Sequence, residues 1–476
     1  MRIINYSRLK RHRLLEKGRA RLFNQPWAAG GLLLLCVVVA MALANLPSTK
    51  EIYHAILHTN LSMSIQSPMD SATGLRAIDW VFPKDMTVEK FINDILMVVF
   101  FFTIVLEIKR EVVCGELSTP KKAMLPVIAA LGGMLVPALI YTLVNGGTAA
   151  ASGWGIATAT DIAFAMGIMS VMGNKVPVSL KVFLTALAIA DDLGAILVVA
   201  FFYGGSINFT LLTIAAVVLL GVWLINRSGE KRMAFYIVPA IVVWFLFYYA
   251  GIHATMAGVV MAMMIPMDAR FSRSYFNKKC DIYQSLMREY DNEEDFPNDN
   301  QRTCLRNISH IADGTVGMSY RLEHALSPWV NFVIMPVFAL ANAGVEIPDL
   351  SYLNIFQYSA QMGSVGIGIF LGLLIGKPIG ITLASWLAIR FKVGEKPAGA
   401  SWRMLFAVAC LGGIGFTMSI FVDTLSFGEL APDVTHHLRS LGKIAVLAGS
   451  MSAGVLGSVL INIFCRTDND KYVSSG

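Results

Sequence analysis

The chain has 476 residues, of which 55% are hydrophobic and only 15% are charged, and its formal net charge is +6. A soluble domain carries about 25% charged residues, so this chain has too little charge to cover a surface that faces water alone. The composition argues against a soluble globular domain and predicts a protein that crosses a membrane many times.

Twelve segments are apolar enough to be transmembrane helices, which need about 20 mostly apolar residues. We expect an all-α polytopic fold with helices near 27–46, 89–108, 123–144, 154–172, 178–202, 207–225, 233–250, 252–266, 327–345, 361–386, 402–422 and 441–464.

Most of the 38 Lys and Arg side chains fall in connections on one side of these segments. Cytoplasmic loops collect such residues, so the excess of positive charge indicates topology and not nucleic-acid binding. The pattern predicts that both termini are cytoplasmic. It also divides the chain into a basic N-terminal arm (1–26), one transmembrane domain (27–465) and a loose cytoplasmic tail (466–476).

Two connections in the transmembrane domain are long. The outer loop 47–88 holds two strand-like runs, LSMSIQ and LRAIDWVF, and predicts a small β-hairpin. The cytoplasmic insert 267–326 is rich in Asp, Glu, Asn and Arg, so we expect it to be partly disordered.

A weak internal symmetry relates segments 3–5 to segments 10–12. The middle segment of each triplet contains an interruption rich in Gly and Thr, GWGIATATDIAFAMG (153–167) and CLGGIGFTMSIF (410–421). The number of intervening segments makes the two triplets run in opposite senses. Inverted repeats with interrupted helices that meet at mid-membrane are typical of secondary transporters.

Ionisable side chains deep in apolar segments are costly and mark functional sites. The deepest are Asp161, Asp191, Asp192 and Lys377, whereas Asp94, Glu107 and Asp423 lie nearer segment ends, where a capping role is equally consistent. Successive helical residues point about 100° apart. The adjacent pair Asp191 and Asp192 therefore cannot serve one purpose.

The chemistry of these groups favours exchange of small cations. Lys377 requires a carboxylate partner, and Asp161 can neutralise the positive ends of interrupted helices. A carboxylate in a cavity, with the Thr160 hydroxyl and free backbone carbonyls nearby, can hold Na⁺ or Li⁺. The same carboxylate can hold a proton instead, because burial favours the protonated form. Competition for one site then exchanges one ion for the other, with no cofactor.

Several motifs in a fixed order resemble the NhaA-type sodium/proton antiporter family. They are INDILMVVFFFTIVLEIKREV, ATATDIAFAMG, FLTALAIADDLGAI, GIHATMAGV, LEHALSPWV, LLIGKPIGI and GGIGFTMSIF. The resemblance covers nearly all of 20–465 except the long insert. It implies twelve helices, with the fourth and eleventh unwound and crossing, and electrogenic exchange activated at alkaline pH in the bacterial inner membrane.

The resemblance also implies roles for particular residues. Asp192 is the primary binding group for the cation and the proton, and Asp191 is its partner, paired with Lys377 in one state. Asp161 and Thr160 are polar residues of the crossing, and Asp94 is of secondary importance. Either Asp191 or Lys377 carries a second proton.

Residues matching the family's pH-responsive region are Glu107, Arg110, Glu111 and His253, although such charge networks and lone histidines are more often structural. The insert 267–326 departs from the simplest family pattern. The outer hairpin implies a homodimer within the lipid bilayer.

Three other functions remain open from the sequence. A proton-coupled transporter of an organic solute would share buried acids and broken helices. An intramembrane aspartyl protease would use paired carboxylates, but it gives Lys377 no task. A channel is distinguished by flux measurements.

Overall fold

The computed structural model describes residues 26–61, 63–66, 79–82, 86–205, 207–290, 296–347, 354–358, 362–428 and 430–473. The basic arm expected at 1–26 lies outside these residues except for Pro26, and so do the last three residues of the expected tail. Within the described ranges the regular secondary structure is helical, apart from one pair of short strands.

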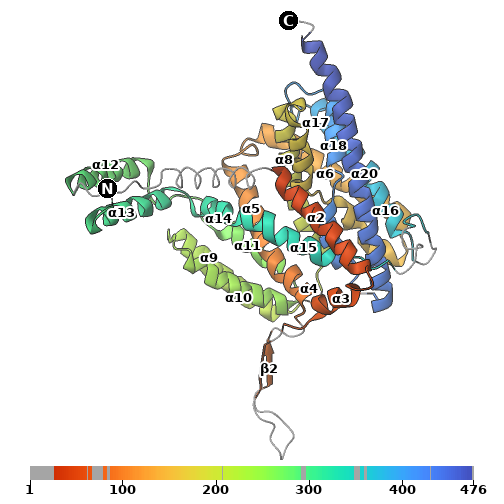
Figure 1. Cartoon of the computed structure of the whole chain (residues 1–476), viewed down its shortest axis with the longest axis horizontal. Helices are drawn as coiled ribbons and strands as arrows, with labels where there is room; N and C mark the ends of the chain where they lie inside the picture. Colours follow the sequence, from red (N-terminus) through yellow and green to blue (C-terminus); the bar gives the residue numbers. More distant parts are fainter. Residues whose placement is uncertain are drawn as a thin grey trace, which may run out of the picture. The chain divides into compact units, whose positions relative to one another are not determined.

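The elements follow one another along the chain as labelled in Figure 1. They are α2 (Pro26–Asn45), α3 (Lys50–His58), β1 (Met63–Gln66), β2 (Asp79–Phe82), α4 (Val88–Phe91), η1 (Ile92–Leu96), α5 (Met97–Val113), α6 (Pro120–Asn145), η2 (Ala149–Thr158), α7 (Ile162–Val171), η3 (Gly173–Lys175), α8 (Val178–Phe202), α9 (Phe209–Arg227), α10 (Ala234–Ala250), α11 (Thr255–Met264), α12 (Arg273–Glu289), α13 (Asp299–Thr315), α14 (Met318–Trp329), η4 (Val330–Ile334), α15 (Met335–Asn342), α16 (Val365–Leu371), η6 (Gly372–Gly376), α17 (Lys377–Arg390), α18 (Trp402–Leu411), α19 (Phe416–Ser426) and α20 (Pro432–Val473).

The length and hydropathy of these helices confirm a polytopic membrane fold. Eight described helices are long and apolar enough to cross a membrane, and the number rises to ten if each of two bent pairs is one span. The bent pairs are η2 with α7, at 42°, and α18 with α19, at 52°. Helices α10 and α11 are apolar but shorter than the usual span.

The helices form two compact units, and residues 1–100, 111–204 and 328–476 belong to the first. In this unit α6 packs closely against α17. A Cβ on Gly132 would lie 2.4 Å from the Gly380 carbonyl oxygen, and a Cβ on Gly380 would lie 2.2 Å from that of Gly132. Only glycine at both positions allows this approach, which is a common device between membrane helices.

Residues 101–110 and 205–327 form the second unit, which contains the insert. The expectation of partial disorder there is wrong over its described part, because α12 and α13 are helices that pack on each other. Apolar residues recur at helical spacing, as at Cys304, Ile308 and Ile311. A capping box between Asn298 and Gln301 begins α13. Residues 291–295 are outside the described chain.

Two further segments also have regular structure. Strands β1 and β2 pair antiparallel, with Met63 opposite Phe82, inside the loop where the sequence predicts a hairpin. The segment expected to be a loose tail differs from the prediction, because α20 continues through Val473. No Gly or Pro interrupts residues 466–473, so nothing there ends the helix.

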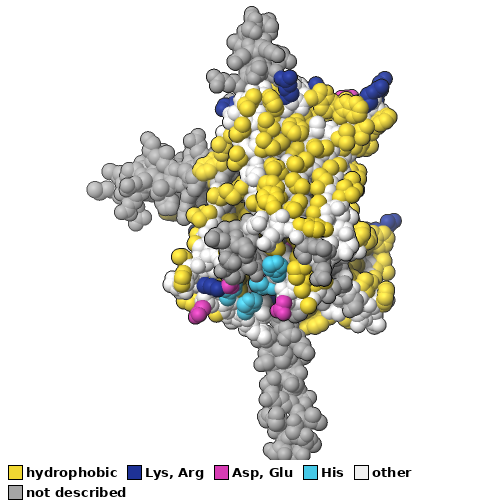
Figure 2. All heavy atoms as spheres, turned by 90° about the vertical axis from the view of Figure 1, so that its right-hand side faces the viewer, with side chains coloured by type: hydrophobic (Ala, Val, Ile, Leu, Met, Phe, Trp, Pro, Cys, Tyr) yellow, Lys and Arg dark blue, Asp and Glu magenta, His cyan; other side chains and the backbone are white. Residues whose placement is uncertain are grey.

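A broad hydrophobic surface covers the face shown in Figure 2, as expected for side chains that contact lipid. Lys and Arg side chains gather at one end of that face, and others lie nearer its opposite end. Histidine and acidic side chains gather towards the other end.

Candidate functional site: a buried carboxylate cluster at two broken helices

The two bent helix pairs meet through their non-helical residues. Between η2 and α7 the backbone is extended at Ala159 and Asp161, and between α18 and α19 the residues 412–415 form the break. The Asp161 N–H donates a hydrogen bond to the Ile414 carbonyl oxygen at 2.7 Å. This contact satisfies backbone groups that would otherwise be unpaired in an apolar interior.

Asp161 lies at the N-terminal ends of both half-helices α7 and α19. Its carboxylate accepts hydrogen bonds from the Phe164 N–H at 3.1 Å and from the Thr417 N–H at 3.2 Å, and also from the Thr417 hydroxyl. The side chain is only 2% exposed. Helix N-termini carry partial positive charge, so one buried carboxylate stabilises two such ends.

Lys377 forms an ion pair with Asp191 in a fully buried environment. Its ammonium group donates to Asp191 Oδ2 and, at 3.0 Å, to Thr160 Oγ1. The exposed fractions are 0% for Lys377 and 1% for Asp191. At this burial each charge requires the other, since an unpaired charge here would cost several kcal/mol.

Thr160 connects this pair to the second break. Its hydroxyl oxygen lies 2.5 Å from Asp191 Oδ2 and 2.7 Å from the Gly412 carbonyl oxygen. A hydroxyl has one hydrogen to donate, so Thr160 donates to one acceptor at a time. Gly412 follows the C-terminal end of α18, and Thr160 therefore links the carboxylate to the negative end of a half-helix.

Asp192 is the neighbour of Asp191 on α8 and is equally buried, at 2% exposed. Its carboxylate interacts electrostatically with Lys377, but the hydrogen bonds from Lys377 and Thr160 go to Asp191. The roughly 100° between successive side chains on a helix accounts for this separation. The cluster thus contains one carboxylate held by a cation and one beside it.

The position of Lys377 follows from the local sequence. It begins α17 directly after the π-helical turn η6, whose glycines bring the backbone close to neighbouring elements. A Cβ on Gly372 would lie 2.8 Å from the Ala157 Cβ, and one on Gly376 would lie 3.0 Å from the Pro137 Cα. Pi-helical turns inside α-helices are frequent at functional sites.

The remaining predicted residues belong to other elements of the fold. Asp94 is half-buried in another π-helical turn, η1, in the first unit. His253 is half-buried before α11, and its carbonyl oxygen accepts a hydrogen bond from the Met256 N–H.

The charged residues at the end of α5 form local networks. In the second unit Arg110 lies 3.0 Å from Glu323 Oε1 and 4.0 Å from Glu107 Oε1. Glu323 is only 5% exposed, so this pair is mostly shielded from solvent. In the first unit Glu111 accepts a hydrogen bond from the Glu116 N–H at 3.1 Å, beyond the helix end.

Two of these partners, Thr417 and Glu323, were not identified from the sequence. Thr417 lies within GGIGFTMSIF, at the start of α19. Its hydroxyl group, next to the interruption, could have suggested a hydrogen bond to one of the buried carboxylates. Glu323 lies within LEHALSPWV. An acid among apolar residues there could have suggested that Glu323 pairs with a basic side chain.

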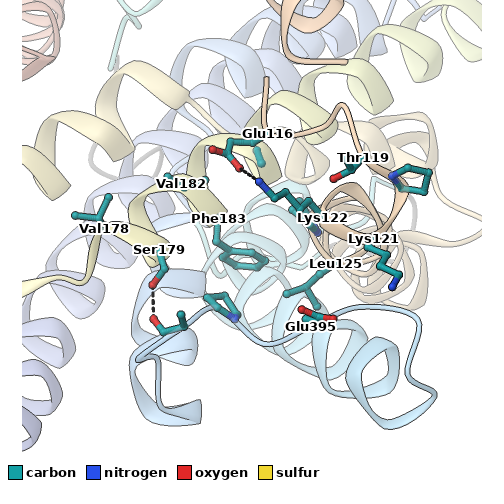
Figure 3. Close-up of a pocket in the computed structure, with 15 residues that line it drawn as sticks. Glu116, Thr119, Lys121, Lys122, Leu125, Val178, Ser179, Val182, Phe183 and Glu395 are labelled. Atoms are coloured by element: carbon teal, nitrogen blue, oxygen red, sulfur yellow. Dashed lines mark hydrogen bonds and ion pairs between the residues drawn. The ribbon is translucent and has the colours of Figure 1, made fainter. Parts of the chain in front are cut away.

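A cavity of about 870 Å³ is lined by other residues than those of this cluster. It lies between the beginnings of α6 and α8 and the loop before α18, and none of the predicted site residues lines it (Figure 3). At its edge Lys122 pairs with Glu116, and the Ser179 hydroxyl donates to the Ala398 carbonyl oxygen at 2.6 Å. In the described part of the chain, no three His, Cys, Asp or Glu side chains are arranged to hold a metal ion.

Comparisons with known proteins give one consistent result. Residues 20–461 match the model of the protein family described as Na⁺/H⁺ antiporter 1. A protein named Na(+)/H(+) antiporter NhaA from Oleidesulfovibrio alaskensis is 39% identical over 453 residues, which is 94% of each chain. Proteins of the same name from Nitrobacter hamburgensis and Acidithiobacillus ferrooxidans are 40% and 41% identical, over 97% and 94% of this chain and 97% and 98% of theirs.

Proposed function

This chain belongs to the Na⁺/H⁺ antiporter 1 family, and we propose that it exchanges cytoplasmic Na⁺ or Li⁺ for external protons by alternating access. It is a transporter and not an enzyme. We propose further that exchange is electrogenic and that alkaline pH activates it.

One observation carries this function: two adjacent buried carboxylates lie beside the buried ammonium group of Lys377, which pairs with Asp191. We assign Asp192 as the group that binds either the alkali cation or a proton. Oxygen ligands suit Na⁺ and Li⁺, and burial of a carboxyl group favours its protonated form. Because one carboxylate cannot hold both ions, loading of Na⁺ must release a proton.

The cluster also suggests how charge is moved. Electrogenic exchange requires a second proton carrier, and we propose either Asp191 or Lys377. The ion pair between them supports both assignments, because separating the pair exposes a carboxylate and an ammonium that can each change protonation. Asp161 and Thr160 hold the broken helices in register around the carboxylates.

The architecture that we propose has twelve transmembrane segments and two inverted repeats. Eight long helices, two bent pairs and the apolar helices α10 and α11 support this count. The repeats comprise α6 to α8 and α16 to α20, and each contains one bent pair. The protein then lies in the bacterial inner membrane with both termini cytoplasmic, and the strand pair β1–β2 contributes to a homodimer.

For the pH response we propose the charged residues at the cytoplasmic end of α5. Arg110 holds the shielded Glu323 as well as Glu107, so a change in protonation there would break an ion pair. We assign Glu111 and His253 to the same response, with Asp94 in a supporting role.

The function is tested in everted membrane vesicles with an imposed pH gradient. Addition of Na⁺ or Li⁺ should dissipate the gradient with wild-type protein and not with Asp192→Asn, while Asp299→Asn, an exposed acid of the insert, should behave as wild type. Dissipation by amino acids and not by Na⁺ would instead identify a solute transporter. Purified protein that binds Na⁺ without releasing protons would refute the exchange mechanism.

A further inference from the structure

A further buried carboxylate, Asp423, lies on the half-helix α19 outside the central cluster. It follows Thr417 by about 9 Å along the helix, at 1.5 Å per residue. Its side chain is 0% exposed, and among the described residues neither carboxylate oxygen accepts a hydrogen bond. A buried carboxylate left in this state is costly, so the position requires an explanation.

The Asp423 carboxylate packs against the backbone of α20 at Gly442, which has no side chain. A Cβ built on Gly442 would lie 2.0 Å from Asp423 Oδ1 and 3.0 Å from its Cγ. Only glycine leaves room for the group at that point. The close fit restricts what else can reach the oxygens, and it excludes a large ligand.

The titratable groups that interact electrostatically with Asp423 come from three parts of the chain. Arg439 and Lys443 lie within electrostatic range on α20, as does Tyr141 on α6 and Tyr203 after α8. The two cations compensate for part of the buried charge, and they oppose the binding of a proton and of an alkali cation alike. The close fit at Gly442 discriminates between the two ions, because a proton needs no further ligands and fits the space.

A cavity of about 340 Å³ adjoins the same two cations. Arg439 and Lys443 line it together with Glu89, Glu346 and three histidines, His54, His58 and His436. His54 Nε2 lies 3.7 Å from Glu346 Oε2, while Glu346 Oε1 pairs with Lys50. His436 is exposed. Histidine and acidic side chains gather at this end of the face in Figure 2. Imidazoles exchange protons near neutral pH.

We propose that Asp423 is a proton-binding site on the outer side of the protein, filled through the histidine-lined cavity, which supplies protons to the central carboxylates. Each proton passes from external water to the Asp423 carboxylate and leaves it ionised again when it moves inward. The inference rests on the proposed exchange function and orientation, in which the ends of α2, α15 and α19 face outwards.

The test uses full-length protein in proteoliposomes, with the internal pH fixed and the external pH varied. At alkaline external pH, where protons are scarce, Asp423→Asn should exchange Na⁺ for protons at least tenfold more slowly than wild type. At acidic external pH the difference should shrink to within about twofold. Asp433→Asn, an exposed acid in the first turn of α20, is the matched control and should keep the wild-type profile.

Proton release on Na⁺ binding, measured in detergent, should stay within twofold of wild type, because the central carboxylates are unchanged. A wild-type external-pH profile for Asp423→Asn would overturn the proposal. If that variant does not fold, a variant with His54, His58 and His436 replaced by Gln provides the test. Slower exchange at alkaline external pH supports the proposed proton path, and an unchanged external-pH profile refutes it. Wild-type protein without Na⁺-driven flux would instead refute the proposed function.

Discussion

Replacement of Lys377 by Ala should destabilise the protein in a pH-dependent way. The substitution removes a cation that is fully buried and leaves Asp191, itself 1% exposed, without its partner. Breaking a buried ion pair from one side costs about 3–5 kcal/mol. The Thr160 hydroxyl bond to Asp191 is present in the wild type as well, so it does not offset this cost. A loss of about 3–5 kcal/mol is therefore expected at alkaline pH.

The loss should shrink as the pH falls, because protonation of Asp191 removes the unpaired charge. Thermal unfolding of purified protein in detergent, measured over a range of pH, checks both the size and the sign. The double variant Lys377→Ala, Asp191→Asn should recover most of the stability at alkaline pH, and Lys396→Ala, at an exposed lysine, serves as the control. If Lys377→Ala unfolds at the same temperature as the wild type at alkaline pH, the ion pair does not stabilise this fold.

Three further substitutions test the surroundings of the site. Thr417→Val removes a hydroxyl bond to Asp161 and should cost about 1.5–3 kcal/mol in thermal unfolding, with slower exchange. Arg110→Gln leaves the shielded Glu323 without its cation and makes protonation easier, so half-maximal exchange activity should move to more alkaline pH. Gly132→Ala forces α6 away from α17 and should cost about 1–3 kcal/mol, whereas Gly221→Ala, with open space around it, should unfold like the wild type.

The sequence located the central cluster because its members are ionisable side chains within otherwise apolar segments, where such side chains are rare. Four ionisable side chains in otherwise apolar runs are conspicuous, and the need of Lys377 for a carboxylate follows from charge alone. Charge alone did not determine which aspartate the lysine takes, since that depends on the rotation of α8; the choice of Asp191 came from the family resemblance. Thr417 was missed for a related reason, because its partner Asp161 is 256 residues away and reaches it only through the crossing of the breaks.

Other parts of the fold depended on weaker patterns. The long apolar helices were predictable from hydropathy, whereas the insert 267–326 was judged by its polar composition. Composition overlooks the spacing of the few apolar residues, and one stripe such as Cys304, Ile308 and Ile311 is enough for two helices to pack. The buried state of Asp423 was also not predictable, because it depends on Gly442 of another helix.

The arrangement of the two adjacent aspartates gives a physical route from cation binding to proton release. Asp191 is held by Lys377 and Thr160, and in the proposed exchange the arriving cation binds Asp192. Lys377 lies within electrostatic range of Asp192, and a cation there repels the ammonium group and weakens its pair with Asp191. In a low-dielectric interior such repulsion is poorly screened. In the proposed exchange, binding at Asp192 is therefore communicated to the proposed second proton carrier without any contact between the two ions.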